Sequence, residues 1–155
     1  MTLTEGFTPI ALIGVISALG VVQIPIDMKT RHLSRPATLL ALTCVMGIGL
    51  VSSWQRGSLQ SLLFASALAG VLGGSYYFVH RLEASNLGFG DVLLVLPLAF
   101  AVAMVNPERL LIWQLFSAVS AAIHGLSLRL RKRGSHLPFG PHLICGALIV
   151  IATSL

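Results

Sequence analysis

Two aspartates are the residues of this chain with the clearest potential for chemistry. Asp27 and Asp91 are its only aspartates, and the remaining acids are Glu5, Glu83 and Glu108. Asp91 lies between a glycine-rich turn, residues 86–90, and a long apolar run, whereas Asp27 ends another apolar run. Because a carboxylate at the edge of a membrane-spanning segment costs solvation free energy, its presence there indicates a function. Two of them predict paired-carboxylate chemistry.

Paired carboxylates suit aspartic proteolysis. One carboxylate acts as a base toward water while the other, protonated, donates to the scissile carbonyl. A helix N-terminus stabilises an anion, and a helix C-terminus destabilises one. We therefore expect Asp91 to be the base and Asp27 to be the acid, in a pair that titrates as a unit. The alternative is that each aspartate only stabilises its helix. Asp91 would then be an N-terminal cap, and Asp27 would pair with Lys29 or Arg31.

The composition of the chain determines the setting for these acids. Hydrophobic residues make up 55% of the 155 residues, charged residues make up 10%, and the mean hydropathy is +0.90. These values exclude an ordinary soluble globule and indicate a polytopic membrane protein, with residues 1–155 forming a single transmembrane domain. The net charge of +5 does not indicate nucleic-acid binding, because the basic residues lie in short gaps between apolar runs, as expected for contact with anionic lipid.

Six apolar runs without period-two alternation predict an all-α bundle of about six transmembrane helices. The runs cover residues 7–26, 37–53, 59–79, 91–105, 110–128 and 141–155. The fourth run is short and contains Pro97, so we expect it to gain length from its flanks.

The basic residues predict the orientation of these spans. Eight of the ten Lys and Arg residues lie in the first, third and fifth loops, and only Arg56 and Arg109 lie in the others. The positive-inside rule therefore predicts that both termini are non-cytoplasmic and that the basic loops are cytoplasmic. Asp27, Asp91 and the loop of residues 134–141 should then meet at the cytoplasmic face.

Three short motifs give the chain a family resemblance. Gly88-Phe89-Gly90-Asp91 resembles the GxGD motif of intramembrane aspartic proteases. The segment of residues 26–31, Ile-Asp-Met-Lys-Thr-Arg, resembles the first aspartate motif of the type IV prepilin peptidases. Residues 138–141, Pro-Phe-Gly-Pro, resemble the proline-glycine loop that precedes the last helix in that family. The three motifs occur in family order across nearly the whole chain.

The resemblance implies a function and a set of site residues. It implies a multi-pass aspartic endopeptidase of the cytoplasmic membrane that removes the leader of type IV prepilin or pseudopilin precursors at the cytoplasmic face, without a cofactor. The catalytic pair would be Asp27 and Asp91. The active-site loop would comprise Gly88, Phe89 and Gly90, whose glycines permit positive φ and close backbone approach. The residues lining the site or contacting substrate would be Pro138, Phe139, Gly140 and Pro141.

The chain departs from the family pattern at several points. Leu93 stands where the family often has a basic residue, and Ser34-Arg35 precede Pro36 where a proline followed by a polar residue is common. Larger relatives carry a cytoplasmic cysteine-bearing segment and methylate the mature N-terminus. No such segment occurs here, so we expect no methyltransferase activity.

Two other functions fit the same acids. One is a small transporter or proton-conducting protein in which the aspartates form a relay, and the other is a noncatalytic relative that binds pilin precursors. A metal centre is not predicted, because the spacings of the histidines near the cytoplasmic face match no ligand signature. These are His32, His80, His136 and His142. His124 should form a hydrogen bond inside the bundle. The four-residue spacing of Ser66, Gly70 and Gly74 predicts helix packing within the bundle, with a dimer contact as the alternative.

Overall fold

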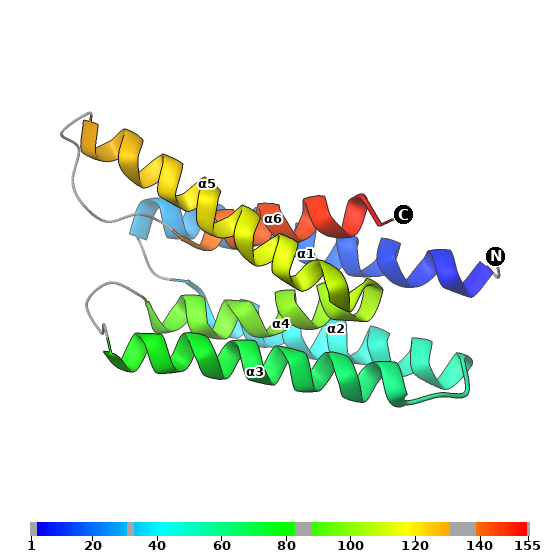
Figure 1. Ribbon diagram of the computed structural model, residues 1–155. Coiled ribbons are helices and arrows are strands. Elements are labelled where there is room, and N and C mark those ends of the chain that lie inside the picture. The colour runs from blue at the N-terminus through cyan, green and yellow to red at the C-terminus, as the bar shows by residue number, and fades with distance from the viewer. Residues whose placement is uncertain (1–2, 31–32, 83–87, 131–138, 155) are drawn as a thin grey trace.

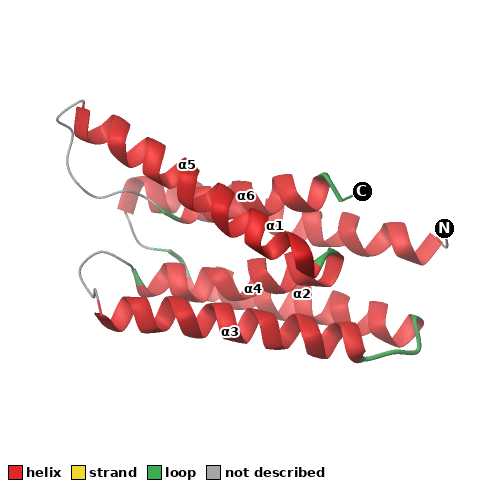
Figure 2. Ribbon diagram, viewed as in Figure 1, coloured by secondary structure: helices red, strands yellow, loops and turns green. Residues whose placement is uncertain are grey.

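The computed structural model describes residues 3–30, 33–82, 88–130 and 139–154, and these form six α-helices and one 3-10 helix (Figure 1). The helices are α1 (Leu3–Thr30), α2 (Arg35–Gln55), α3 (Gln60–Leu82), α4 (Phe89–Val105), η1 (Pro107–Arg109), α5 (Leu110–Leu130) and α6 (Gly140–Ala152). The described residues contain no strand (Figure 2). The all-helical prediction is confirmed, and each predicted apolar run corresponds to one α-helix.

Successive α-helices run in opposite directions along the bundle (Figure 1). The two chain ends, the α2–α3 turn and the α4–α5 connection lie at one end of it. The end of α1 and the starts of α4 and α6 lie at the opposite end, as the order of the apolar runs predicts. The helices that carry the three motifs therefore meet at one end of the bundle.

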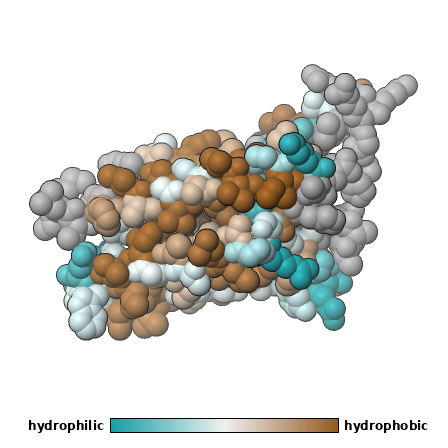
Figure 3. Space-filling model, turned by 180° about the vertical axis from the view of Figure 1, so that it is seen from behind, coloured by the Kyte–Doolittle hydropathy of each residue, from teal (hydrophilic) through white to brown (hydrophobic). Residues whose placement is uncertain are grey.

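The outer surface of the bundle is strongly apolar. Val21 is 76% exposed and Leu111 is 80% exposed, although each lies within a helix. On the face shown in Figure 3, hydrophobic residues cover the middle and hydrophilic residues gather toward the two ends. Four helical segments are long and apolar enough to cross a membrane, namely Phe7–Lys29, Arg35–Gln55, Gln60–Leu82 and Pro107–Ser127. These features are those of a multi-pass membrane protein.

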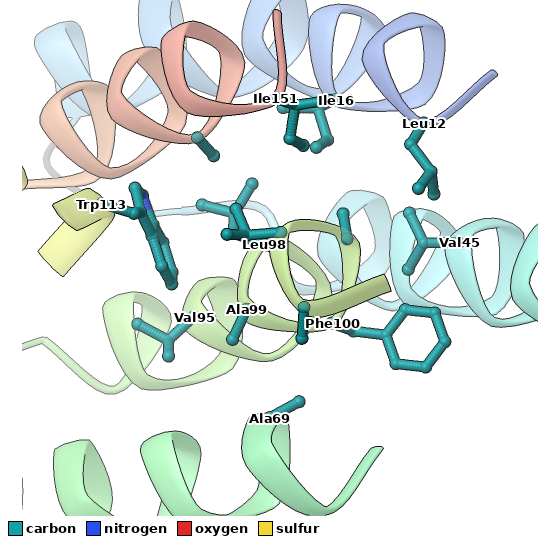
Figure 4. Close-up of a cluster of buried hydrophobic side chains, with 14 of the residues drawn as sticks. Leu12, Ile16, Val45, Ala69, Val95, Leu98, Ala99, Phe100, Trp113 and Ile151 are labelled. Carbon is teal, nitrogen blue, oxygen red and sulfur yellow. The ribbon is translucent and has the colours of Figure 1, made fainter. Parts of the chain in front are cut away.

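Helix α4 forms the centre of the bundle. Leu94, Val95 and Leu98 are completely buried, and the apolar side chains of α4 point in all directions, as expected for a helix surrounded by others. Residues from the other five α-helices pack around it, including Leu12 and Trp113 (Figure 4). With 17 residues, α4 is shorter than the four long helices. Pro97 lies inside α4 without ending it, and Phe89 and Gly90 extend the predicted run at its start.

The packing surface of α3 differs from the predicted one. Gly70 and Gly74 are exposed, and a Cβ built on either would meet no atom within 4 Å, so the predicted stripe with Ser66 does not pack inside the bundle. The buried small residues of α3 are instead Ala65, Ala69 and Gly73. Gly73 lies directly against Leu96 of α4. Both stripes have four-residue spacing, so spacing alone does not identify the buried one.

Candidate active site

The two aspartates approach each other at one end of the bundle. Asp27 lies in the last turn of α1, which ends at Thr30, and its side chain is 6% exposed. Asp91 lies in the first turn of α4 and is partly buried. Their carboxylates are close enough to interact electrostatically. The helices thus bring together two acids that are separated by 64 positions in the sequence.

Asp91 also stabilises the start of its own helix. Gly88 is the N-cap of α4, its carbonyl accepts from the backbone N–H of Asp91 at 3.0 Å, and its own N–H donates to the Asp91 carboxylate. This is the acidic half of a capping box, in which the third helical residue reaches back to the cap. Asp91 is therefore not the N-cap itself, which is Gly88, but it stabilises that cap from the first turn. Capping also fixes the position of this carboxylate, which suits a catalytic role equally well.

Asp27 is held differently. The backbone amide of Gly140, at the start of α6, lies against its carboxylate, and a Cβ built on Gly140 would be 3.0 Å from Asp27 Oδ2. Oδ2 is buried and has no hydrogen-bond partner among the residues that the structure describes. Lys29, two positions further along α1, is exposed, and Arg31 lies outside the described residues. A buried carboxylate oxygen with spare acceptor capacity is a candidate for chemistry.

Leu33 connects the starts of α4 and α6. A Cβ built on Gly90 would lie 2.9 Å from Leu33 Cβ, and one built on Gly140 would lie 3.2 Å from Leu33 Cδ2. Both glycines therefore make room for the same leucine. The sequence suggested two uses for Gly88 and Gly90, positive φ and close backbone approach, and neither glycine uses the first. Gly88 has φ −68° and Gly90 is helical, so close approach is what Gly90 provides.

A buried glutamine fixes the position of Leu33. Gln23 is completely buried in α1, one helical turn before Asp27. Its amide nitrogen donates to Ser34 O and Thr38 Oγ1, and its Oε1 accepts from the Ser34 N–H, all at 2.8 Å. These bonds hold Ser34 and the first turn of α2 against α1. Gln23 was not among the predicted site residues, although a polar residue inside an apolar run, four positions before Asp27, is a signal that could have identified it.

The remaining predicted site residues lie at the starts of α4 and α6, where they have different neighbours. Phe89 is 37% exposed and contacts the His80 ring, at 5.9 Å between centroids, and the Arg35 guanidinium, at 5.5 Å. Phe139 is the N-cap of α6 and lies 6.4 Å from the Tyr76 ring, and Pro141 occupies the first turn of α6. Of the predicted site residues, Pro138 lies outside the described part of the chain.

Polar residues of α3 and α5 complete the surroundings. The Tyr76 hydroxyl donates to Gln114 Oε1 at 2.6 Å, and the phenol is close enough to Asp91 for an electrostatic interaction. Neither residue was singled out from the sequence. Tyr76 is preceded by Ser75 and followed by Tyr77, and nothing in that pattern distinguishes the residue that faces the bundle.

Two of the histidines, His124 and His142, form a separate cluster between α5 and α6. His124 Nδ1 and His142 Nε2 are 3.0 Å apart, and His142 Nδ1 is 3.0 Å from Ser120 Oγ. The prediction that His124 forms a hydrogen bond inside the bundle is confirmed. No group of three metal-ligating side chains occurs among the described residues, and His32 and His136 lie outside them.

The arrangement can support hydrolysis of an amide bond. It offers two neighbouring carboxylates in apolar surroundings, which favours a proton shared between them. Comparisons of the chain with protein-family models, with curated proteins and with solved structures find no match.

Proposed function

We propose that this chain is a membrane-embedded aspartic endopeptidase that removes the leader of type IV prepilin-like precursors at the cytoplasmic face of the cell membrane. One observation carries the proposal: the carboxylates of Asp27 and Asp91 interact at one end of the bundle, with Gly140 against Asp27. The three motifs that resemble the prepilin peptidases supply these three residues.

The proposed reaction uses the two carboxylates in complementary roles. One ionised aspartate takes a proton from water, whose oxygen attacks the carbonyl carbon of the scissile peptide bond. The protonated aspartate donates to the carbonyl oxygen, and collapse of the tetrahedral intermediate breaks the C–N bond with proton transfer to the leaving amine. Because the two carboxylates titrate as a unit, either of them can take the role of the base.

The orientation of the site follows from the basic residues. In the proposed topology all six α-helices cross the membrane, and the end that carries Asp27 and Asp91 faces the cytoplasm. Lys29, Arg35 and Arg81 belong to that end, whereas Arg56 belongs to the opposite one. Precursor proteins would then present their cleavage site from the cytoplasmic side.

The proton-relay alternative is less well supported. A relay needs ionisable or polar groups that continue from the aspartates toward the opposite end of the membrane. From Val92 to Val105, α4 carries only apolar side chains, so the central helix supplies no such group beyond Asp91. Both acids instead belong to one end of the bundle, where a peptide can enter from water.

The test is cleavage of a co-expressed prepilin-type precursor, scored by the gel shift that accompanies loss of its leader. The wild-type chain should cleave, and Asp27→Asn and Asp91→Asn should each abolish cleavage while the protein remains inserted and folded. Neither carboxamide can exchange a proton with water and the scissile amide. Glu108→Gln, the same chemical change at an exposed residue of the opposite end, is the matched control and should cleave normally.

Lys29→Ala separates catalysis from charge balance. Lys29 is exposed, so its removal should change the cleavage rate only modestly if the aspartates are catalytic. If Asp27 serves only to balance that charge, removing the base should damage the fold as much as removing the acid. Cleavage retained in Asp27→Asn or Asp91→Asn would contradict the two-aspartate mechanism. Precursor binding without cleavage by the wild type would favour the noncatalytic relative.

A further inference from the structure

A hydrogen bond between Tyr76 and Gln114 bridges two helices that supply none of the predicted site residues. Tyr76 belongs to α3 and Gln114 to α5, which lie on different sides of α4 (Figure 1). The Tyr76 hydroxyl donates to Gln114 Oε1 at 2.6 Å, a short distance for a neutral pair. Both residues lie within segments long and apolar enough to cross a membrane. Polar side chains in such segments bond across helices or serve a function.

The position of this pair connects it to the aspartates. The Tyr76 ring is 6.4 Å from the ring of Phe139, which directly precedes Gly140. Gly140 in turn lies against Asp27. The Tyr76 phenol also interacts electrostatically with Asp91. The Tyr76 end of the pair therefore lies within electrostatic range of Asp91 and beside the segment, Phe139–Gly140, that contacts Asp27.

The pair retains unused hydrogen-bonding capacity. Tyr76 donates its only hydroxyl proton to Gln114, so the phenol oxygen keeps its acceptor lone pairs. Nε2 of Gln114 is buried and has no partner among the described residues. A buried donor without a partner is unfavourable, and such a group in a native protein requires an explanation. A ligand that supplies an acceptor would provide one.

A peptide undergoing cleavage in this site needs hydrogen-bond partners for its backbone. In a helix, each backbone N–H and C=O is already bonded within the segment, so the peptide must unwind before its scissile bond can be attacked. Unwinding frees backbone donors and acceptors in apolar surroundings, where they are costly unless they find partners. One donor and one acceptor side by side match one residue of an extended peptide, whose N–H and C=O point to the same side.

We propose that Tyr76 and Gln114 bind the main chain of the unwound substrate beside the scissile bond. Gln114 Nε2 donates to a substrate carbonyl, and the Tyr76 oxygen accepts from a substrate N–H. This inference rests on the proposed peptidase function and adds two binding residues to it. The ligand is the extended peptide backbone, so these contacts are independent of the substrate side chains.

The test is steady-state cleavage of a purified prepilin-type precursor by the full chain in detergent. Gln114→Met and Tyr76→Phe should each raise KM about 10-fold, the size of one lost hydrogen bond, with kcat changed less than about 3-fold. The double variant should be little worse than either single variant, because the two residues act as one unit. Gln60→Met and Tyr77→Phe, at exposed positions of α3, are the matched controls and should keep the parent KM.

Direct binding gives a second measurement. In the Asp91→Asn background, which leaves the precursor uncut, Gln114→Met should weaken precursor binding about 10-fold. If Gln114→Met does not fold, Gln114→Glu replaces it. The glutamate keeps an acceptor for Tyr76 but removes the Nε2 donors, so an increased KM supports the proposal.

Each result has a defined meaning. An unchanged KM in folded Gln114 and Tyr76 variants overturns this inference and leaves the proposed function intact. A lower melting temperature together with an unchanged KM would show that the Tyr76–Gln114 hydrogen bond has a structural role alone. Failure of the wild-type chain to cleave any precursor overturns the proposed function and this inference together.

Discussion

Replacing Gly140 by alanine tests whether the space beside Asp27 is needed for catalysis. The added Cβ would lie 3.0 Å from Asp27 Oδ2 and 3.2 Å from Leu33 Cδ2, whereas ordinary contacts begin at 3.4 Å. To reach an ordinary contact, the carboxylate or the start of α6 must move by about 0.4 Å. The neighbouring Leu33 also contacts the position of Gly90, so it has little room to move away.

This displacement can be converted into a rate. A misplacement of about 1 Å in a catalytic group costs on the order of 10²-fold. If the logarithm of the loss scales with distance, about 0.4 Å predicts a loss of about 6-fold in kcat. The same crowding should lower the free energy of unfolding by about 1–3 kcal/mol, as for other overpacked sites. The variant should therefore be slower, still folded and somewhat less stable.

The assay is single-turnover cleavage of a prepilin-type precursor at saturating enzyme, with thermal unfolding measured on the same preparation. Gly70→Ala is the matched control, because Gly70 is exposed and its added Cβ would meet nothing within 4 Å. It should cleave at the parent rate and gain up to about 1 kcal/mol of helix stability. A Gly140→Ala protein that cleaves at the parent rate would refute the reasoning, as would an equal loss in Gly70→Ala.

Four further predictions concern the site and its supports. Asp27→Glu should lose on the order of 10²-fold in cleavage rate, because one extra methylene moves the reacting oxygen by about 1 Å; full activity in the gel-shift assay would contradict this. Gln23→Leu should lower the free energy of unfolding by about 3 kcal/mol, since it removes the three hydrogen bonds of a completely buried side chain; an unchanged melting curve would show that they contribute nothing. Trp113→Phe should cost about 1–3 kcal/mol by the same measurement, because the buried indole N–H donates to a backbone carbonyl of α6 at 2.9 Å. In a protein without its native cysteines, Ser34→Cys should resist membrane-impermeant thiol reagents in intact cells and Ser58→Cys should react, and the reverse pattern would overturn the proposed orientation.

The helices were predictable because their signals are local. Long apolar runs separated by short polar gaps identify membrane-length helices without any knowledge of their partners, and each predicted run matches one α-helix within a few residues. The ends were less predictable. Helix α1 continues past residue 26 to Thr30, which places Asp27 inside its last turn. The polar residues of that turn carry no apolar signal, so hydropathy alone ended the run too early.

The candidate acids were also predictable, because they are rare. Asp27 and Asp91 stand out among few charged residues, and neighbouring glycines mark the second of them. Their partners were not predictable in the same way. Gln23, Leu33, Tyr76 and Gln114 belong to common residue types in ordinary positions, and only the packing of α1, α3 and α5 reveals which of their neighbours they contact.

The sequence by itself determined that this protein is helical, apolar along its spans and equipped with two acids beside apolar runs. These properties depend on hydropathy and residue type, which each residue carries regardless of its surroundings. Only the tertiary structure decided that the Asp27 and Asp91 carboxylates interact, that Gly140 lies against Asp27 and that Gly73 rather than Gly70 packs on α4. Those contacts depend on the rotation and depth of each helix relative to the others. Side-chain packing across the bundle sets the rotation and the depth of each helix. That packing involves residues far apart in the sequence, so no local stretch of sequence specifies it.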